Sequence, residues 1–311
     1  MKLLIFIVNK QAGNGKGLKV WNQLKHELEQ KKIHYRSFFT KYPNHAGELA
    51  RQIGSMFDVK VEAVVAVGGD GTINEVVNGM VYYPEIKVGY IPAGSGNDFS
   101  RGFNVPSSPL DALSFIIRNK SGKGKLFDIG KCKIQGKTKS SYFVSSLGTG
   151  FDAAVAKQTN ESQVKKYLNK VHLGSLAYVF ALIRLLFTYR LTNVTVSIDG
   201  KEFHYEDVWF VTVSNQPFYG GGMKIAPQAK TTDGLFDVTI VHHLSRIKLL
   251  FVFVTVFFGT HTKFKEIAQH KGVTIRIESD ENMFVHTDGE FIGQTPVKVD
   301  VQHRQIPFLV E

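Results

Sequence analysis

The sequence predicts an α/β protein in two parts: an N-terminal doubly wound domain and a β-rich C-terminal domain, with a cleft between them. Two observations carry this prediction. Over the first 120 residues, short apolar runs alternate with segments of helical periodicity, which is the pattern of βαβ units. Beyond about residue 121, strand-like runs follow one another between tight turns, which is typical of a β-rich domain.

The first part is expected to contain four strands, each followed by a helix. The strands are expected at 3–8, 35–40, 63–67 and 87–91, and the helices at about 18–31, 45–56, 72–80 and 109–119. Residues 61–67 are almost continuously apolar, as expected of a parallel strand that helices cover on both faces. Residues 1–8 hold one lysine before a short apolar run and no small-residue cleavage pattern, so we interpret them as a strand rather than a signal peptide.

The second part is expected to be mainly β. Its strands are expected at 193–198, 201–204, 273–278, 283–287 and 296–301, and its helices at about 152–189 and 245–258. Between the first two strands, Asp199-Gly200 predicts a hairpin with a type I′ turn, because these residues accept the positive φ angles of that turn. We therefore place the domains at residues 1–122 and 123–311, with the last strand free to return to the first domain.

The composition is that of a packed globular protein, with 43% hydrophobic and 21% charged residues. The single cysteine, Cys132, excludes an internal disulfide and fits a reducing, cytoplasmic compartment. The net charge of +11 favours a polyanionic partner, such as a nucleotide, an anionic membrane surface or a nucleic acid. The sequence has no basic helix, no RNA-binding aromatic strand motif and no zinc-binding spacing, so no nucleic-acid partner is expected.

Basic residues are densest between Arg118 and Lys139, where eight of them accompany a single acid. This run is either an ordinary solvated face or a surface that contacts an anionic membrane, together with Lys165, Lys166 and Lys170.

Two apolar stretches, 173–189 and 249–258, bear on membrane insertion. Arg184 interrupts the first, and the second spans ten residues, about half of what a bilayer crossing requires. Neither is expected to cross a membrane. Both are expected to form apolar faces in the core or at an interface, with the core favoured.

The most specific motif lies at residues 67–75, where an apolar strand ends in Gly68 and Gly69, followed by Asp70 and a helix. Glycines let the backbone approach phosphate oxygens, and free N–H groups at a helix N-terminus bind anions. A carboxylate there would repel phosphate, but it can hold Mg²⁺, which prefers oxygen ligands and bridges protein and nucleotide. The motif therefore predicts a phosphate site with magnesium. A glycine-rich turn capped by the aspartate is the alternative.

Two further glycine loops follow predicted strands, at residues 91–99 and 9–17. In a doubly wound sheet, loops after successive strands gather at the carboxyl edge, where ligands bind, so the loops at 67–75 and 91–99 should face one another. By itself, the loop at 91–99 is equally compatible with a turn and a helix cap. The loop at 9–17 matches neither the P-loop spacing nor the three-glycine dinucleotide fingerprint.

Taken together, these motifs resemble those of the bacterial diacylglycerol kinase-like lipid kinases. The resemblance rests on five blocks that occur in the order the family shows, at residues 68–79, 92–99, 148–153, 232–238 and 287–290. It implies an N-terminal nucleotide domain like that of phosphofructokinases and NAD kinases, and a β-rich C-terminal domain. It also implies an active site in the interdomain cleft and ATP-dependent phosphorylation of a lipid hydroxyl.

The resemblance implies roles for individual residues as well. Asp70 and Asp98 would belong to the catalytic Mg²⁺ and phosphate network, and Glu290 would be the general base. A second Mg²⁺ would be held near the β domain by the carboxylate of Asp233 and by two backbone carbonyls, those of Lys230 and Leu235. The co-substrate ATP would contact residues Asn9, Lys10, Gln11, Ala12, Gly13, Thr40, Gly69, Asp70, Gly71, Thr72, Ile73, Asn74, Glu75 and Ser95.

The chain departs from the family pattern at two positions. Lys10 stands where the family usually has proline, and Ser95 replaces the commoner threonine while keeping a hydroxyl that can bind phosphate. On the residues alone, Glu290 follows an Asp-Gly turn much like Asp199-Gly200, so a structural hairpin is the alternative reading of that site. Asp233 is likewise followed by a glycine and would otherwise be another turn residue.

The sequence and the resemblance together predict an Mg²⁺-dependent lipid kinase that acts on diacylglycerol or a related membrane lipid. A NAD kinase-like nucleotide kinase and a noncatalytic lipid- or nucleotide-binding protein are the alternatives. The protein is expected in the cytoplasm, peripheral at the inner membrane face, with ATP, the lipid and an anionic membrane as partners. The sequence does not name the lipid, and it leaves the oligomeric state open, with a homodimer among the options.

Overall fold

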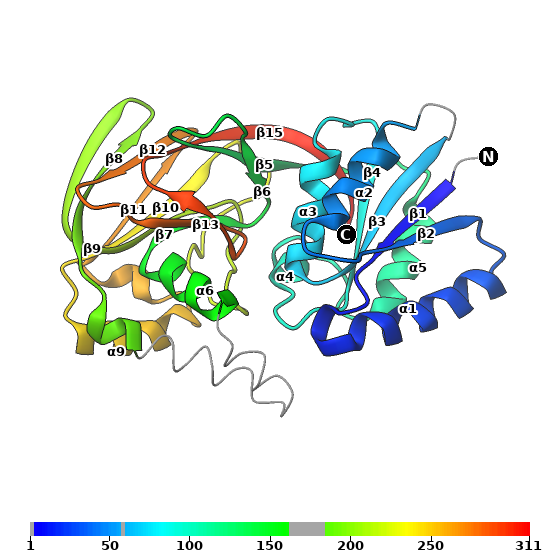
Figure 1. The fold of residues 1–311 in the computed structure, drawn as a ribbon, viewed down its shortest axis with the longest axis horizontal. Helices are drawn as coiled ribbons and strands as arrows, with labels where there is room; N and C mark the ends of the chain where they lie inside the picture. Colours follow the sequence, from blue (N-terminus) through cyan, green and yellow to red (C-terminus); the bar gives the residue numbers. More distant parts are fainter. Residues whose placement is uncertain (1–2, 57–59, 162–183) are drawn as a thin grey trace.

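The computed structural model describes residues 3–56, 60–161 and 184–311. The chain forms two lobes that lie side by side (Figure 1). We call the elements up to residue 119 the N-terminal lobe and those from residue 125 onward the C-terminal lobe. In the described ranges, all fifteen strands belong to one continuous sheet that runs through both lobes.

The N-terminal lobe alternates strands and helices. Its elements are β1 (Leu3–Val8), α1 (Ala12–Gln30), β2 (Tyr35–Phe39), α2 (His45–Gly54), β3 (Val61–Gly68), α3 (Asp70–Met80), β4 (Lys87–Pro92), α4 (Asp98–Gly102) and α5 (Pro109–Asn119). The four strands are parallel, in the order β2-β1-β3-β4. Helices α2 and α3 lie on one face of this sheet and α1 and α5 on the other (Figure 1). The predicted doubly wound arrangement is confirmed.

The C-terminal lobe is mainly β, as predicted. Its elements are β5 (Lys125–Ile134), β6 (Ser141–Phe143), β7 (Ser146–Gly150), α6 (Phe151–Glu161), β8 (Thr192–Ile198), β9 (Lys201–Ser214), β10 (Phe236–His242), α9 (Arg246–Val256), the 3-10 helix η1 (His261–Lys263), β11 (Ile267–Gly272), β12 (Thr274–Ser279), β13 (Phe284–Thr287), β14 (Glu290–Gln294) and β15 (Val297–Leu309). The helix predicted at 152–189 begins as α6 and is helical again at 184–188, and its middle lies outside the described residues.

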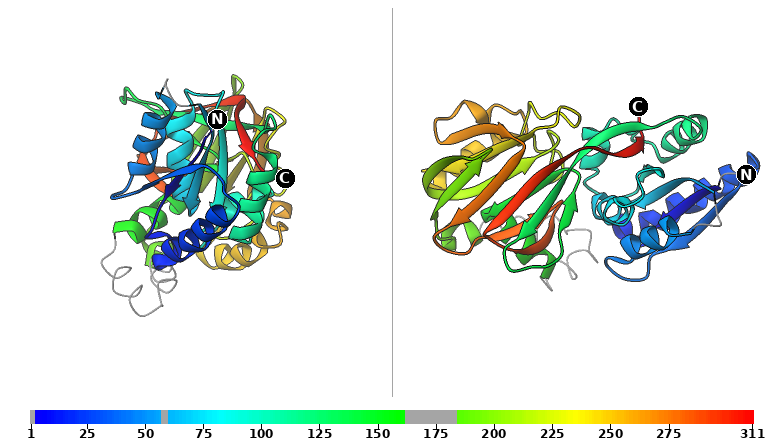
Figure 2. Two further views of the ribbon diagram at one scale, coloured as in Figure 1. Left: turned by 90° about the vertical axis from the view of Figure 1, so that its right-hand side faces the viewer. Right: turned by 90° about the horizontal axis from the view of Figure 1, so that it is seen from above.

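Strand β15 connects the two lobes. It pairs with β12 and β5 in the C-terminal lobe, and its end pairs in parallel with β4, where Phe308 lies opposite Val88. The side chain of Phe308 is fully buried against Phe99 and Phe103 of the N-terminal lobe. Figure 2 shows this strand, in red, crossing from one lobe to the other. The last strand of the chain therefore contributes to both cores.

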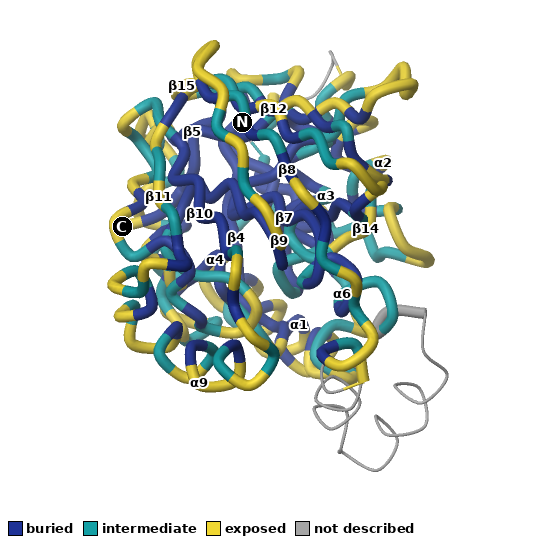
Figure 3. The backbone as a smooth tube through the Cα atoms, turned by 90° about the vertical axis from the view of Figure 1, so that its left-hand side faces the viewer, coloured by how far each residue is buried: buried dark blue, intermediate teal, exposed yellow. Residues whose placement is uncertain are grey.

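The apolar run at 249–258 forms most of α9 and only partly enters the core. Leu249, Val252 and Val256 are buried, whereas Phe251 and Phe258 are 72% and 73% exposed. Figure 3 shows buried and exposed residues alternating along this helix at the edge of the C-terminal lobe. Among the helices of the described ranges, none is long and apolar enough to cross a membrane.

Candidate active site

The three glycine loops meet at the carboxyl ends of β1, β3 and β4. A Cβ atom added to Gly94 would lie 2.5 Å from the Cα atom of Gly69, and one added to Gly13 would lie 2.6 Å from the carbonyl oxygen of Ala93. These contacts leave no room for a side chain, so the loops pack backbone against backbone. The expectation that the loops after β3 and β4 face one another is confirmed, and the loop after β1 joins them.

The loops line a cavity of about 450 Å³, which we call the loop cavity. Ten of the predicted ATP-contacting residues line it, namely Asn9, Gln11, Ala12, Gly13, Thr40, Gly69, Gly71, Thr72, Glu75 and Ser95. Lys41, Tyr42, Pro43, Gly94 and, from the other lobe, Glu290 complete the wall. Helix α3 begins beside this cavity, at Asp70, so its N-terminal N–H groups and dipole favour an anion there.

The other four predicted ATP-contacting residues lie outside this wall. Asp70 lines a neighbouring cleft, and the side chain of Ile73 is fully buried in the core of the N-terminal lobe. The ammonium group of Lys10 lies over the ring of Phe39, 4.7 Å from its centroid. The side chain of Asn74 reaches toward the C-terminal lobe. A nucleotide contact from Ile73 would therefore have to come from its backbone.

Local hydrogen bonds and left-handed backbone shape the loop after β1. The Nδ2 atom of Asn9 donates to Oγ1 of Thr72 over 3.1 Å, which ties this loop to the start of α3. Gly13, Asn14 and Gly15 have φ angles of 56°, 56° and 90°, so the regular part of α1 begins after them. This agrees with the predicted helix start near residue 18, and the glycines adopt such angles without a Cβ clash.

Glu75 lines the loop cavity and also binds the start of helix α2. Its carboxylate accepts hydrogen bonds from the backbone N–H groups of Asn44 and Ala46, over 3.0 and 2.9 Å, at the start of α2. Burial raises the pKa of this carboxyl above its usual range, and nearby Glu290 adds to the increase. Glu75 therefore stabilises the N-terminus of α2 while it lines the cavity.

A second cavity lies between the lobes, and we call it the acidic cleft. It holds about 300 Å³. It is lined by Asp70, Gly96, Asp98, Ser145, Ser146, Asp152, Ala156, Tyr219, Gly220, Gly221, His286, Asp288 and Gly289. Two of the carboxylates come from the N-terminal lobe and two from the C-terminal lobe, so the expected interdomain cleft exists and has an acidic wall.

Asp70 and Asp98 converge at the rim of this cleft. The carboxylate of Asp70 accepts hydrogen bonds from the backbone N–H groups of Asp98 and Phe99, over 3.2 and 3.0 Å. A Cβ atom added to Gly96 would lie 3.0 Å from Oδ2 of Asp70 and 3.8 Å from Oδ2 of Asp98. Burial raises the pKa of Asp70, and the negative charges of Asp98 and Asp288 raise it further. This concentration of carboxylate oxygen is what a divalent cation would neutralise.

Asp98 also contacts the opposite lobe. Its Oδ1 atom accepts from Nη1 of Arg101 over 2.8 Å, and its Oδ2 atom accepts from the backbone N–H of Gly221 over 2.6 Å. Arg101 therefore partly balances the charge of Asp98, and the contact with Gly221 fixes the width of the cleft at this point.

Asp288 holds the lobes together, a role that the sequence analysis missed. Its carboxylate accepts from the backbone N–H groups of Val144, Ser145 and Ser146, all within 3.0 Å, and from Nδ2 of Asn74 over 2.6 Å. Burial raises the pKa of Asp288 above its usual range. The signal in the sequence is the Asp-Gly-Glu block at residues 288–290, whose local pattern predicts only a turn.

Asp152 and His286 form a pair that the sequence analysis also did not single out. The Nε2 atom of His286 lies 3.3 Å from Oδ2 of Asp152, and its Nδ1 atom accepts from the backbone N–H of Gly289 over 3.2 Å. Since Nδ1 must offer a lone pair to Gly289, the ring proton is assigned to Nε2, which donates to Asp152. The imidazole thus orients one carboxylate in the acidic cleft.

Glu290 is both a hairpin residue and part of the loop cavity. It pairs with Thr287 across the turn between β13 and β14. Its Oε1 atom lies 3.7 Å from the position of a Cβ atom added to Gly71, in the first turn of α3. The hairpin therefore carries an exposed carboxylate from the C-terminal lobe to the loop cavity, beside the first turn of α3.

The residues predicted to hold a second Mg²⁺ lie in the turn before β10. Asp233 accepts a hydrogen bond from the backbone N–H of Leu235 over 3.2 Å, and both Lys230 and Asp233 are exposed. One carboxylate and two carbonyls make an all-oxygen set, which suits magnesium. The ranges that the structure describes contain no group of three or more His, Cys, Asp or Glu side chains arranged to hold a metal. Magnesium binding here stays a prediction.

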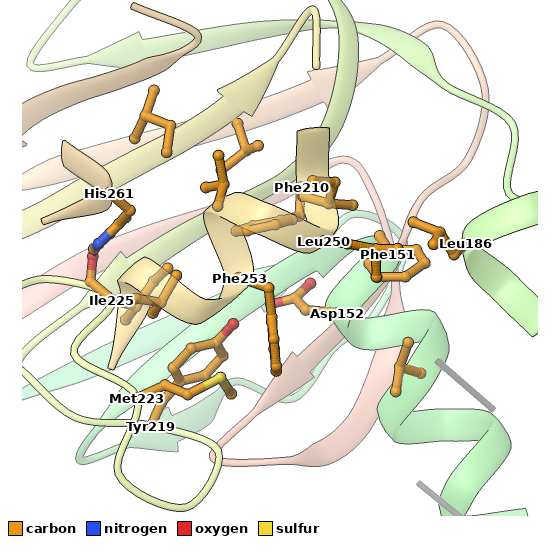
Figure 4. Close-up of a pocket in the computed structure, with 16 residues that line it drawn as sticks. Phe151, Asp152, Leu186, Phe210, Tyr219, Met223, Ile225, Leu250, Phe253 and His261 are labelled. Atoms are coloured by element: carbon orange, nitrogen blue, oxygen red, sulfur yellow. The ribbon is translucent and has the colours of Figure 1, made fainter. Parts of the chain in front are cut away.

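A third cavity, which we call the apolar cavity, lies between α6 and α9 (Figure 4). Its wall includes Phe151, Phe210 and Phe253, and it holds about 60 Å³. Asp152 and Tyr219 line both this cavity and the acidic cleft. Figure 4 shows both side chains in this wall, where His261 is the other polar side chain and the remaining lining residues are apolar. The apolar cavity and the acidic cleft are therefore neighbours that meet at these two side chains.

Comparison with known proteins identifies the family. Residues 3–131 match the family model for the diacylglycerol kinase catalytic domain, and residues 145–310 match that for the YegS C-terminal NAD kinase beta sandwich-like domain. The chain belongs to the diacylglycerol kinase-like lipid kinase family.

Individual relatives agree with this assignment. The chain is 35% identical over 295 residues to the "Putative lipid kinase YtlR" of Bacillus subtilis strain 168, covering 94% of this chain and 95% of the relative. It is 33% identical to the diacylglycerol kinase of Staphylococcus carnosus strain TM300, covering 76% and 72% of the two chains. A crystal structure of a diacylglycerol kinase from Bacillus anthracis strain Sterne has the same fold, with a TM-score of 0.74, 22% identity, and 100% and 97% coverage.

Proposed function

We propose that this protein transfers the γ-phosphoryl group of ATP to the hydroxyl of a membrane lipid, with diacylglycerol as the acceptor that its relatives' names favour. The observation that carries the proposal is the order of the three cavities. The loop cavity suits a nucleotide, the acidic cleft borders it through Asp70, and the apolar cavity opens from the cleft at Asp152 and Tyr219. A lipid whose acyl chains point toward the apolar cavity would present its hydroxyl to the nucleotide at the border of the acidic cleft and the loop cavity.

ATP would bind with its phosphates against the loops after β1, β3 and β4. The N-terminus of α3 supplies backbone donors, and the close glycine contacts allow the phosphates to reach them. Ser95 and Thr72 add hydroxyl groups to the wall.

Asp70 and Asp98 would hold the catalytic Mg²⁺. Their oxygens converge beside Gly96, at the border of the loop cavity and the acidic cleft. When bound, the metal would offset the negative charge that develops on the transferring phosphoryl group. The hydrogen bonds from Asp98 N–H and Phe99 N–H hold the carboxylate of Asp70 in place for this task.

Glu290 would act as the general base. It would accept the proton of the lipid hydroxyl while the hydroxyl oxygen forms a bond to the γ-phosphorus and the bond from that phosphorus to the bridging oxygen of ADP breaks. Its exposed carboxylate lines the loop cavity near Gly71, where the γ-phosphate would lie. The pair of His286 and Asp152 would position the acceptor, because it stands at the mouth of the apolar cavity.

The direct test is phosphoryl transfer from radiolabelled ATP to a panel of purified lipids in mixed micelles. The panel should contain diacylglycerol, phosphatidylglycerol and a sphingoid base, and NAD should be tested as an acceptor in a parallel reaction. We expect label in diacylglycerol. This labelling should require Mg²⁺, and it should disappear in the Asp98→Asn variant. Label in none of the lipids would overturn the proposal, and label in NAD would favour the nucleotide-kinase alternative.

A further inference from the structure

The surface of α9 carries a continuous apolar stripe. Its residues recur at helical spacing and are 41% to 73% exposed: Ile247, Leu250, Phe251, Val254, Phe257 and Phe258. The stripe holds six of the fifteen exposed large apolar side chains of the described ranges. An exposed patch of this kind marks an interaction site rather than ordinary surface.

The neighbouring segment 184–190 extends the stripe. The guanidinium of Arg246, in the first turn of α9, donates to the backbone carbonyls of Leu186 and Tyr189, which holds this segment against the helix. Phe187 in the same segment is 62% exposed. The apolar surface therefore continues beyond α9.

The exposed charges next to the stripe in the sequence are positive, and Glu266, which pairs with Lys248 of α9 over 2.6 Å, is buried. From residue 245 to residue 265 the chain contains no Asp or Glu, and Lys263 and Lys265 are exposed. Arg184 and Arg190 are exposed on the neighbouring segment, which also contains no acid. An apolar centre bordered by cations matches the surface of a bilayer that contains anionic lipids.

Helix α9 also separates the stripe from the apolar cavity. Its opposite face supplies Leu249, Val252 and Val256 to the wall of that cavity, and Leu250 and Phe253 contribute as well. The cavity is small as it stands, at about 60 Å³, so an acyl chain could enter only if side chains of α9 or α6 moved. A membrane in contact with the stripe would lie one helix away from the cavity.

We infer that the α9 stripe is the surface by which this protein docks on an anionic lipid bilayer, with Phe251 and Phe258 entering the acyl region and Lys263, Lys265, Arg184 and Arg190 contacting headgroups. The inference rests on the proposed function, since a lipid acceptor reaches the protein from the bilayer. It places the membrane next to the apolar cavity that would receive that acceptor.

This surface differs from the basic run at 118–139. The part of that run on β5 lies along the upper edge of the molecule in Figure 1, and α9 lies at the lower edge, so the two are separate surfaces. Lys165, Lys166 and Lys170 lie outside the described residues. A second copy of this chain suits the stripe less well than a bilayer does, because self-association would bring the bordering cations of two copies together.

The test is vesicle co-sedimentation of the full-length protein without ATP. The vesicles contain phosphatidylcholine alone or equal parts of phosphatidylcholine and phosphatidylglycerol. The parent should bind the anionic vesicles, and less tightly at higher salt. The Phe251→Ser/Phe258→Ser variant should bind at least tenfold more weakly. The matched control is Tyr82→Ser/Leu110→Ser, which removes two exposed apolar side chains from the N-terminal lobe and should bind like the parent.

A pair of charge variants separates the two basic surfaces. Lys263→Gln/Lys265→Gln should weaken binding and reduce its salt dependence, whereas Lys131→Gln/Lys133→Gln should not.

A Phe251→Trp variant should show fluorescence quenching by brominated acyl chains that a Tyr82→Trp variant lacks. Three results would each overturn the inference. The first is parent-like vesicle binding by Phe251→Ser/Phe258→Ser, and the second is weaker binding by Lys131→Gln/Lys133→Gln than by Lys263→Gln/Lys265→Gln. The third is a parent protein that is a dimer and loses that dimer in Phe251→Ser/Phe258→Ser.

The assay distinguishes this inference from the proposed function. Vesicle binding requires no turnover, so it can succeed even if no lipid is phosphorylated. Conversely, phosphorylation of a short-chain diacylglycerol dissolved as monomers should be retained by the Phe251→Ser/Phe258→Ser variant, because that acceptor needs no bilayer. Loss of that activity in a folded variant would place the stripe in the active site and overturn its role as a docking surface.

Discussion

Two Asp-Gly turns in the C-terminal lobe have the same backbone and different surroundings. Asp199 and Gly200 have φ angles of 50° and 84°, and Asp288 and Gly289 have angles of 47° and 87°. Each turn joins two antiparallel strands. The carboxylate of Asp199 is exposed and accepts from the backbone N–H groups of the neighbouring strand, at Val273 and Thr274.

The second turn faces the other lobe. Asp288 accepts four hydrogen bonds, one of them from Asn74 of the N-terminal lobe, and the next residue but one, Glu290, lines the loop cavity. The position that corresponds to Glu290 in the first turn is Lys201, which lies at the start of β9 on the surface. The local sequence therefore determines the turn, and the place of the hairpin in the sheet determines whether the turn belongs to a site.

A large effect on turnover is expected in the cleft that the second turn faces. Asp70→Asn should lower turnover by roughly 10²–10³, because it removes a charge that we propose holds Mg²⁺ while one side-chain oxygen remains to accept from Phe99 N–H. Steady-state phosphorylation of diacylglycerol and a melting curve on the same sample would check this. Near-normal turnover by the folded variant would exclude Asp70 from the chemistry.

The next effect is on stability and separates the two aspartates. Asp288→Ala should destabilise the fold by about 2–4 kcal/mol, since it leaves several backbone N–H groups and Asn74 without their acceptor. Asp199→Ala, on an exposed turn, should cost about 1 kcal/mol or less. Urea unfolding of both variants measures the difference. Equal losses would show that Asp288 does not hold the lobes together.

The pH dependence of the Asp288→Ala loss gives a finer comparison. Burial raises the pKa of Asp288 in the folded protein above its value in the unfolded chain. As pH rises above about 4, this carboxyl ionises in the unfolded chain before it ionises in the folded protein. The free energy of unfolding of the parent therefore falls until the pH reaches the raised pKa. The variant lacks this group. The stability margin of the parent over Asp288→Ala should therefore be largest near pH 4 and narrow toward neutral pH. A margin that widened toward neutral pH would mean that the four hydrogen bonds lower the pKa of Asp288 by more than burial raises it.

The smallest effect should be the same in both turns. Gly200→Ala and Gly289→Ala each place a Cβ atom on a residue with positive φ, and neither Cβ would have a neighbour within 4 Å. Each should cost about 1 kcal/mol of stability, because only the backbone strain is involved. Thermal unfolding compares them directly. If the losses of stability in the two variants differed by much more than about 1 kcal/mol, the two turns would not be locally equivalent.

The parts of the fold that depend on short-range pattern could be predicted from the sequence. The strands of the N-terminal lobe, the glycine loops after them and the Asp199-Gly200 hairpin follow from periodicity and turn chemistry. The convergence of the loops follows from the rule that parallel strands present their carboxyl ends at one edge. Ten of the fourteen predicted nucleotide-contacting residues accordingly line one cavity.

The parts that depend on contacts distant in sequence could not be predicted in the same way. The Asp152–His286 pair and the contact of Asp288 with Asn74 join residues 134 and 214 positions apart, and the local sequence does not encode such neighbours. Residues 249–258 are apolar on every side of the helix, so their pattern could not show which face would be buried. The family resemblance, rather than the turn itself, singled out Glu290.

The most direct test of the account compares the corresponding residues after the two turns, in Glu290→Gln and Lys201→Gln. Glutamine keeps the size of the glutamate but cannot accept the hydroxyl proton, so Glu290→Gln should lower turnover by roughly 10²–10⁴ with little change in ATP affinity or melting temperature. Lys201→Gln should leave all three unchanged. Unchanged turnover in Glu290→Gln, with diacylglycerol phosphorylation intact in the parent, would contradict the claim that the second turn places the catalytic base in the loop cavity.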